Sequence, residues 1–201
     1  MKLTPTPDMP LSDRKIPSDD AKNALYVVSI SKFVWLYVLT GSGYIFYWSY
    51  RNWASYRAAT GVDIMPIMRG VFWPFFILSL FEKVQNGLET AGRSCQWYPE
   101  ARGLLIMLLV LISVLLSPFF SPLSGTLFVF IADMVLIAAG TGLFVGAQRA
   151  INLLHDDPQG RSNSVLSVGN LVWMVLGGLY LFFVAIAAIV TLMVAGYLAL
   201  T

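Results

Sequence analysis

Two charged residues lie inside otherwise apolar stretches of the sequence, and they are the residues best placed to do chemistry. Asp133 is the single charge in residues 126–147, and Arg69 is the single charge in residues 64–81. An ionisable side chain inside a membrane span is costly, so it usually pairs with an opposite charge or lines a path for ions or substrates. On the sequence alone, both uses are open to Arg69 and Asp133.

An ion pair between these two residues follows from their predicted depths. If both stretches run inward from the outer surface, Arg69 lies about 7 Å deep and Asp133 about 12 Å deep, at about 1.5 Å per helical residue. The arginine side chain is long enough to cover that difference. In the alternative, Arg69 extends to the outer lipid headgroups and Asp133 stays protonated, so each charge is accommodated separately.

Catalytic and metal-binding chemistry has little support in the sequence. The chain has one histidine, His155, and one cysteine, Cys95, which fall in different loops. His155, Asp156 and Asp157 are adjacent in the sequence, so their side chains do not face one site on a helix. Pro158 follows directly, which is typical of a solvated helix end. No nucleotide-binding or zinc-protease motif is present. We therefore predict no enzyme activity, no catalytic residue, no metal site and no cofactor.

A pattern of small residues predicts a helix interface. Ala138, Gly142, Gly146 and Ala150 recur every four residues, which places them on one face of a helix and lets a neighbouring backbone approach closely. The neighbour can belong to the same chain or to a second copy of it.

Aromatic residues crowd the end of the first apolar segment. Their rings favour the boundary between lipid and water, so they predict an interfacial aromatic belt, with an aromatic ligand-binding box as the alternative. The residues of this predicted belt are Tyr44, Tyr47, Trp48, Tyr50 and Trp53.

The composition places the chain among integral membrane proteins. Of its 201 residues, 57% are hydrophobic and 12% are charged, whereas about a quarter are charged in an average soluble domain. The net charge of +2 is too small, and the Lys and Arg residues are too dispersed, for nucleic-acid binding. We predict an all-α integral membrane helix bundle, whose partners are the lipid bilayer and either a second copy or another membrane protein.

Five apolar segments are long enough for transmembrane helices of about 20 residues. They are residues 33–50, 64–81, 103–120, 126–147 and 172–194. The second segment contains Arg69 and two prolines, so four spans and one re-entrant segment form the alternative. Residues 25–201 then make one transmembrane domain. Residues 1–24 lack the apolar core of a signal peptide and are predicted to be a flexible, uncleaved tail.

The positions of Lys and Arg predict the orientation. Residues 121–125 carry no charge and belong outside, which places residues 82–102 and 148–164 inside, where Lys and Arg are favoured. With five spans, the N-terminus is cytoplasmic and the C-terminus is periplasmic. Arg51 and Arg57 then lie outside, directly after a span, and are the exceptions to this rule.

The stretch YIFYWSYRNW, residues 44–53, followed by Pro66, Arg69 and Phe72, resembles an uncharacterised group of small bacterial inner-membrane proteins. In that group the first helix ends in a Tyr-x-x-Tyr-Trp-x-Tyr-Lys/Arg-Asn-Trp element, and a Pro-x-x-Arg-x-x-Phe element follows. The resemblance implies a location in the bacterial inner membrane and no particular activity.

The sequence thus predicts a non-enzymatic, multi-pass inner-membrane protein with a structural, envelope-related or partner-binding role. A small transporter or channel subunit that uses Arg69 and Asp133 is the first alternative. A membrane enzyme is the second.

Overall fold

The chain folds into helices throughout the part that the structure describes. The computed structural model describes residues 24–116 and 126–198, and the predicted tail lies almost entirely outside them. Seven α-helices and no strand occur in these residues, so the all-α prediction is confirmed. The helices are α2 (Ile30–Leu39), α3 (Tyr44–Thr60), α4 (Pro66–Val71), α5 (Trp73–Thr90), α6 (Pro99–Leu116), α7 (Thr126–Leu154) and α8 (Val168–Leu198).

Two helices are long and apolar enough to cross a membrane. They are α7, over Phe128–Leu154, and α8, over Val168–Leu198, among the described residues. The prediction of five such helices is therefore wrong. The third predicted span coincides with α6, but its residues 117–120 lie outside the described part of the chain.

The first predicted span, residues 33–50, is wrong because the chain reverses in its middle. Helix α2 ends at Leu39 and α3 begins at Tyr44, with Gly41 and Ser42 both at positive φ, +56° and +67°. Glycine enters this region without a steric penalty, so the Gly-Ser-Gly sequence favours a turn over a continuous helix. The Phe33 ring, on α2, lies 5.7 Å from the Tyr44 ring, on α3, which places the two helices side by side in a hairpin.

The second predicted span, residues 64–81, is divided between two helices. Helix α4 ends at Val71, and α5 starts at Trp73 with Pro74 in its first turn. Proline has no backbone N–H and is tolerated only where a helix begins, so a single helix through this position is disfavoured. Helix α4 packs on α3, whereas α5 continues to Thr90 and packs on α6.

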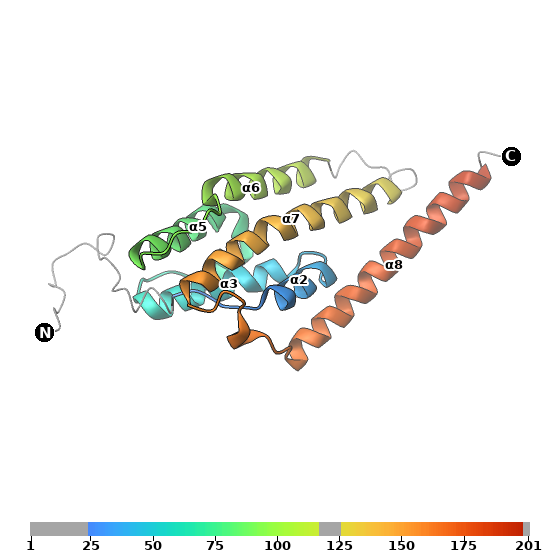
Figure 1. The fold of residues 1–201 in the computed structure, drawn as a ribbon. Coiled ribbons are helices and arrows are strands. Elements are labelled where there is room, and N and C mark those ends of the chain that lie inside the picture. Colours follow the sequence, from blue (N-terminus) through green and yellow to red (C-terminus); the bar gives the residue numbers. More distant parts are fainter. Residues whose placement is uncertain (1–23, 117–125, 199–201) are drawn as a thin grey trace, which may run out of the picture.

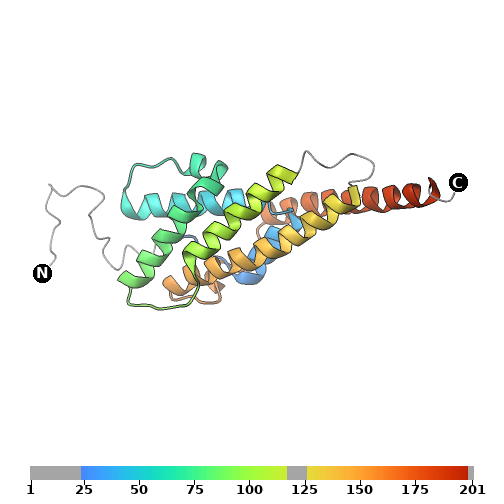
Figure 2. The same cartoon turned by 90° about the horizontal axis from the view of Figure 1, so that it is seen from above.

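The core lies where α2, α3, α5 and the last half of α7 meet. Its largest fully buried side chains include Phe33, Trp48, Trp53, Phe81 and Phe144. Helix α8 touches α2 and α7 but otherwise leaves the bundle, and Ala188 is its buried residue. Figures 1 and 2 show its C-terminal end reaching beyond the other helices. The compact core thus occupies one end of the molecule, and long apolar helices project from the other.

Candidate functional site

A non-helical segment, residues 24–29, passes through the core, and side-chain amides bind its backbone. Tyr26 N–H donates to Asn52 Oδ1, at 3.1 Å, and Tyr26 C=O accepts from Gln148 Nε2, at 3.2 Å. Val28 C=O accepts from Asn152 Nδ2, at 3.0 Å. A buried backbone group without a partner is destabilising, so these amides make the buried path of the segment tolerable.

Two of these amides form a connected pair on α7. Gln148 and Asn152 are fully buried one helical turn apart, and Gln148 Nε2 also donates to Asn152 Oδ1, at 2.7 Å. The indole N–H of Trp48 donates to Gln148 Oε1, at 2.5 Å. This network was not predicted from the sequence. Its one visible signal is a Gln and an Asn four residues apart at the end of an apolar helix.

Lys32 extends the polar contacts to the loop before α8. It is buried, and its Nζ donates to Asn163 Oδ1 and to the Val165 carbonyl, both at 2.7 Å. Asn163 Nδ2 in turn donates to the Val27 carbonyl, at 2.8 Å. These contacts fix the end of the α2–α3 hairpin that lies away from its turn.

At the turn of the hairpin lies a cavity of about 300 Å³, which is our candidate functional site. The turn and Trp73 contribute one side, and three helices contribute the others: α6 with Ser113, α7 with Asp133 and α8 with Tyr180. Among the described residues that line it, Asp133 is the one that is acidic or basic. The cavity thus lies where the short helices end and the long ones continue.

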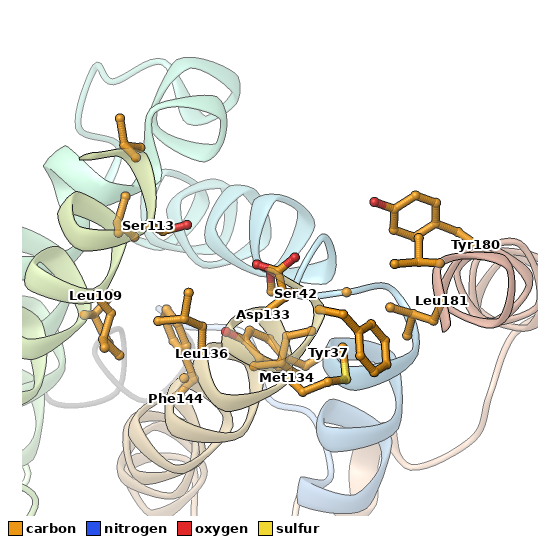
Figure 3. Close-up of a pocket in the computed structure, with 18 of the residues that line it drawn as sticks. Tyr37, Ser42, Leu109, Ser113, Asp133, Met134, Leu136, Phe144, Tyr180 and Leu181 are labelled. Atoms are coloured by element: carbon orange, nitrogen blue, oxygen red, sulfur yellow. The ribbon is translucent and has the colours of Figure 1, made fainter. Parts of the chain in front are cut away.

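Four hydroxyl groups accompany the carboxylate on the cavity lining. They belong to Tyr37, Ser42, Ser113 and Tyr180, while most other lining residues are apolar. Figure 3 shows Ser113 and Tyr180 on opposite sides of Asp133, projecting into the space between the helices. A pocket of this size with few polar groups is typical of a small-molecule site.

Close helix packing underlies one wall of the cavity. Gly140 is buried on α7, and a Cβ at this position would overlap the Tyr37 hydroxyl of α2. The Phe144 ring, one turn further along α7, lies 5.7 Å from both the Tyr37 and the Trp73 rings. The missing side chain at Gly140 therefore lets α2 bring Tyr37 to the cavity.

The structure does not bring Arg69 and Asp133 together. The Arg69 guanidinium lies 4.2 Å from the centre of the Trp53 ring and 5.0 Å from that of Phe76. The ion pairs among the described residues are Lys83 with Glu82 and Arg93 with Asp156. Arg69 is thus accommodated by aromatic faces, which attract cations.

The predicted small-residue face of α7 divides into two parts. Ala150 is buried, and Gly146 contacts Arg102, whose guanidinium would overlap a Cβ there. Ala138 and Gly142 are exposed, and Gly142 has open space at its Cβ position. Within the chain, the close approach occurs through Gly140 instead.

The predicted aromatic belt is also divided. Trp48 and Trp53 are fully buried, and Tyr44 is 7% exposed, so these three rings belong to the core. Tyr47 and Tyr50 remain at the surface. Tyr44 and Trp48 pack against Phe33 of α2, and Trp53 packs against Arg69 of α4, so the tertiary contacts of α3 decide which rings are buried.

His155, Asp156 and Asp157 each have a separate structural environment. Burial lowers the pKa of His155, the positive charge of Arg93 lowers it further, and its buried Nε2 has no hydrogen-bond partner in the described structure. Asp156 pairs with Arg93. Asp157 accepts from the backbone N–H groups of Ser162 and Arg161, which lower the pKa of its carboxyl.

Cys95 is a free thiol whose pKa is raised by burial, which reduces its reactivity. Among the described residues, no group of three or more His, Cys, Asp or Glu could hold a metal ion. No protein-family model matches the chain, and no match was found among curated proteins or solved structures.

Proposed function

We propose that the chain is a non-enzymatic, multi-pass membrane protein that binds a partner molecule inside the membrane, in the cavity beside Asp133. The observation that carries this proposal is the position of that carboxylate. Residues 103–147 and 162–201 contain one charge, Asp133, and it lines the cavity. A charge retained in such a stretch is expected to be functional.

The proposal includes a revised topology, in which α6, α7 and α8 cross the membrane. All 13 Lys and Arg residues then lie on one side, because each falls within residues 1–102 or 148–161. This satisfies the preference of Lys and Arg for the cytoplasmic side better than five spans, which place Arg51 and Arg57 outside. The N-terminus is cytoplasmic and the C-terminus periplasmic, as the sequence predicts, and the resemblance to bacterial inner-membrane proteins supports the same location.

In this topology the α2–α3 hairpin and the start of α5 enter the membrane from the cytoplasmic side. Supporting this, the start of α5 exposes apolar surface, with Phe75 at 76% exposure, beside the spanning helix α6. The hairpin turn then forms the cytoplasmic floor of the cavity. Non-helical backbone at membrane depth is tolerated where it lines a cavity, as it does here.

Movement of ions or solutes is the second candidate function. It is favoured because the non-helical turn of the α2–α3 hairpin and the Asp133 carboxylate line the same cavity, and broken helices beside such groups recur at transporter binding sites. The structure separates Arg69 from this site, so a pathway would depend on Asp133 alone. Solute flux into proteoliposomes that exceeds flux into empty vesicles, and that Asp133→Asn abolishes, would favour transport over binding alone.

A membrane-soluble carbodiimide tests the proposed site. Such reagents modify carboxyl groups that are reached from the lipid phase, so we expect one modified residue, Asp133, in proteoliposomes containing the full chain. Asp133→Asn should abolish the modification, and Glu100→Gln, which removes a carboxylate near the cytoplasmic end of α6, should leave it unchanged. Modification at Glu100 but not at Asp133 would contradict the proposal.

A further inference from the structure

We infer that the cavity binds a small organic cation, whose positive charge lies against the Asp133 carboxylate. The inference rests on the proposed function and adds the chemical class of the ligand. Three features of the cavity support it: its uncompensated charge, its aromatic lining and its size.

The charge of Asp133 has no basic partner in the described structure. Arg69 is held over Trp53. Arg102, on the neighbouring helix α6, donates instead to the carbonyls of Trp97, Gly142 and Leu143. A carboxylate inside the membrane is stabilised by an opposite charge, so a cationic ligand supplies what the chain itself does not.

The aromatic lining is suited to a cation with little hydration. Trp73 and Tyr180 line the cavity from α5 and α8, together with Tyr37 from α2. Aromatic faces attract ammonium groups. A neutral ligand would gain from the same rings only through its apolar surface.

The size of the cavity favours an organic over an inorganic cation. A volume of about 300 Å³ is far larger than a bare metal ion needs. Calcium, for comparison, takes about 6–8 oxygen ligands close around it, whereas this lining offers one carboxylate and scattered hydroxyls. An ammonium group on a small hydrocarbon body matches both the charge and the apolar walls.

Benzyltrimethylammonium and its neutral isostere neopentylbenzene provide a matched test, because they differ in charge and hardly in shape. With the full chain in detergent micelles, we expect calorimetric binding of the cation and none of the isostere. Asp133→Asn should weaken binding of the cation by about tenfold or more, whereas Asp133→Glu, which keeps the carboxylate, should retain binding. Tyr180→Leu should weaken binding, whereas Tyr180→Phe, which keeps the ring, should not.

Protection from the carbodiimide separates this inference from the proposed function. We expect benzyltrimethylammonium, but neither neopentylbenzene nor sodium or potassium chloride, to protect Asp133 from modification. Protection by the neutral isostere or by the salts would overturn the inference and leave a binding cavity of another specificity. Absence of modification at Asp133 would overturn the proposed function itself. Equal binding of the cation to wild type and Asp133→Asn would overturn the inference, whatever the result of the protection experiment.

Discussion

The two halves of helix α7 are both mostly apolar but differ in what surrounds them. From Gly140 to Leu154 the helix is packed, with Phe144, Gln148 and Asn152 all buried. Before Gly140 it presents Ile131 and Val135 at the surface, 52% and 61% exposed. Polar side chains occur in both halves, but in the packed half the buried Gln148 and Asn152 are hydrogen-bonded, and in the projecting half Asp133 lines a cavity.

This contrast separates polar side chains that stabilise the fold from a polar side chain that is available to bind a ligand. A buried amide with several partners stabilises the fold, because every donor and acceptor is satisfied. A carboxylate without a partner contributes little to the fold, so its presence is explained by what it binds. Substitutions in the two halves should therefore differ in kind as well as in size.

The largest effect is expected in the packed half, from Gln148→Leu. Leucine has a similar size but leaves the Trp48 indole N–H, the Tyr26 carbonyl and Asn152 Oδ1 without their partner. We expect the free energy of unfolding in detergent micelles to fall by about 3 kcal/mol. Thr191→Val on the exposed α8 is the matched control, with a change within about 0.5 kcal/mol. Equal losses in the two variants would remove the contrast.

A smaller effect is expected from two glycines that lie two residues apart. Gly140→Ala places a methyl group against the Tyr37 hydroxyl and should lower the free energy of unfolding by about 2 kcal/mol. Gly142→Ala enters open space and should be neutral or stabilise by up to about 1 kcal/mol, because alanine favours the helix. Thermal unfolding of both variants checks the pair. A larger loss for Gly142→Ala would indicate that its face contacts a second copy.

The third prediction concerns Arg69 and Asp133, the two charges that the sequence predicted to lie inside the membrane. Arg69→Leu removes the stacking on Trp53 and Phe76 and should lower the free energy of unfolding by about 1 kcal/mol. Asp133→Leu should leave it unchanged or raise it. In a double-mutant cycle the two changes should add within about 0.5 kcal/mol, because the residues share no contact. A coupling clearly above that value would restore the ion pair.

The smallest effect is expected from His155, which directly follows the C-terminal end of α7. Its pKa is lowered in the folded chain, so the unfolded chain binds more protons below the unperturbed value of about 6.5. The free energy of unfolding should therefore fall as the pH decreases from 7.5 to 5.5, and His155→Gln should flatten this dependence. Asp157, with its lowered carboxyl pKa, titrates below this range. An unchanged slope in His155→Gln would assign the pH dependence to another group.

Local features of the sequence were enough for part of this fold. The apolar composition and the length of the apolar segments predicted an all-α chain and located α7 and α8, because these signals need no knowledge of distant residues. Asp133 stood out for the same reason. The glycines and prolines that interrupt the first two apolar segments were visible as well, yet their effect was underestimated, and two continuous helices were predicted where four occur.

The tertiary structure alone decided which face of each helix is buried. A four-residue spacing of small residues selected Ala138 and Gly142, but α2 packs against Gly140, since the partner helix determines the register. Trp48 can be buried in the core because its indole N–H donates a hydrogen bond to Gln148, which lies one hundred residues away in the sequence. Composition and spacing thus fixed which segments are helical and apolar, whereas contacts between distant residues fixed the core and the cavity, because burial depends on the partner that a surface meets.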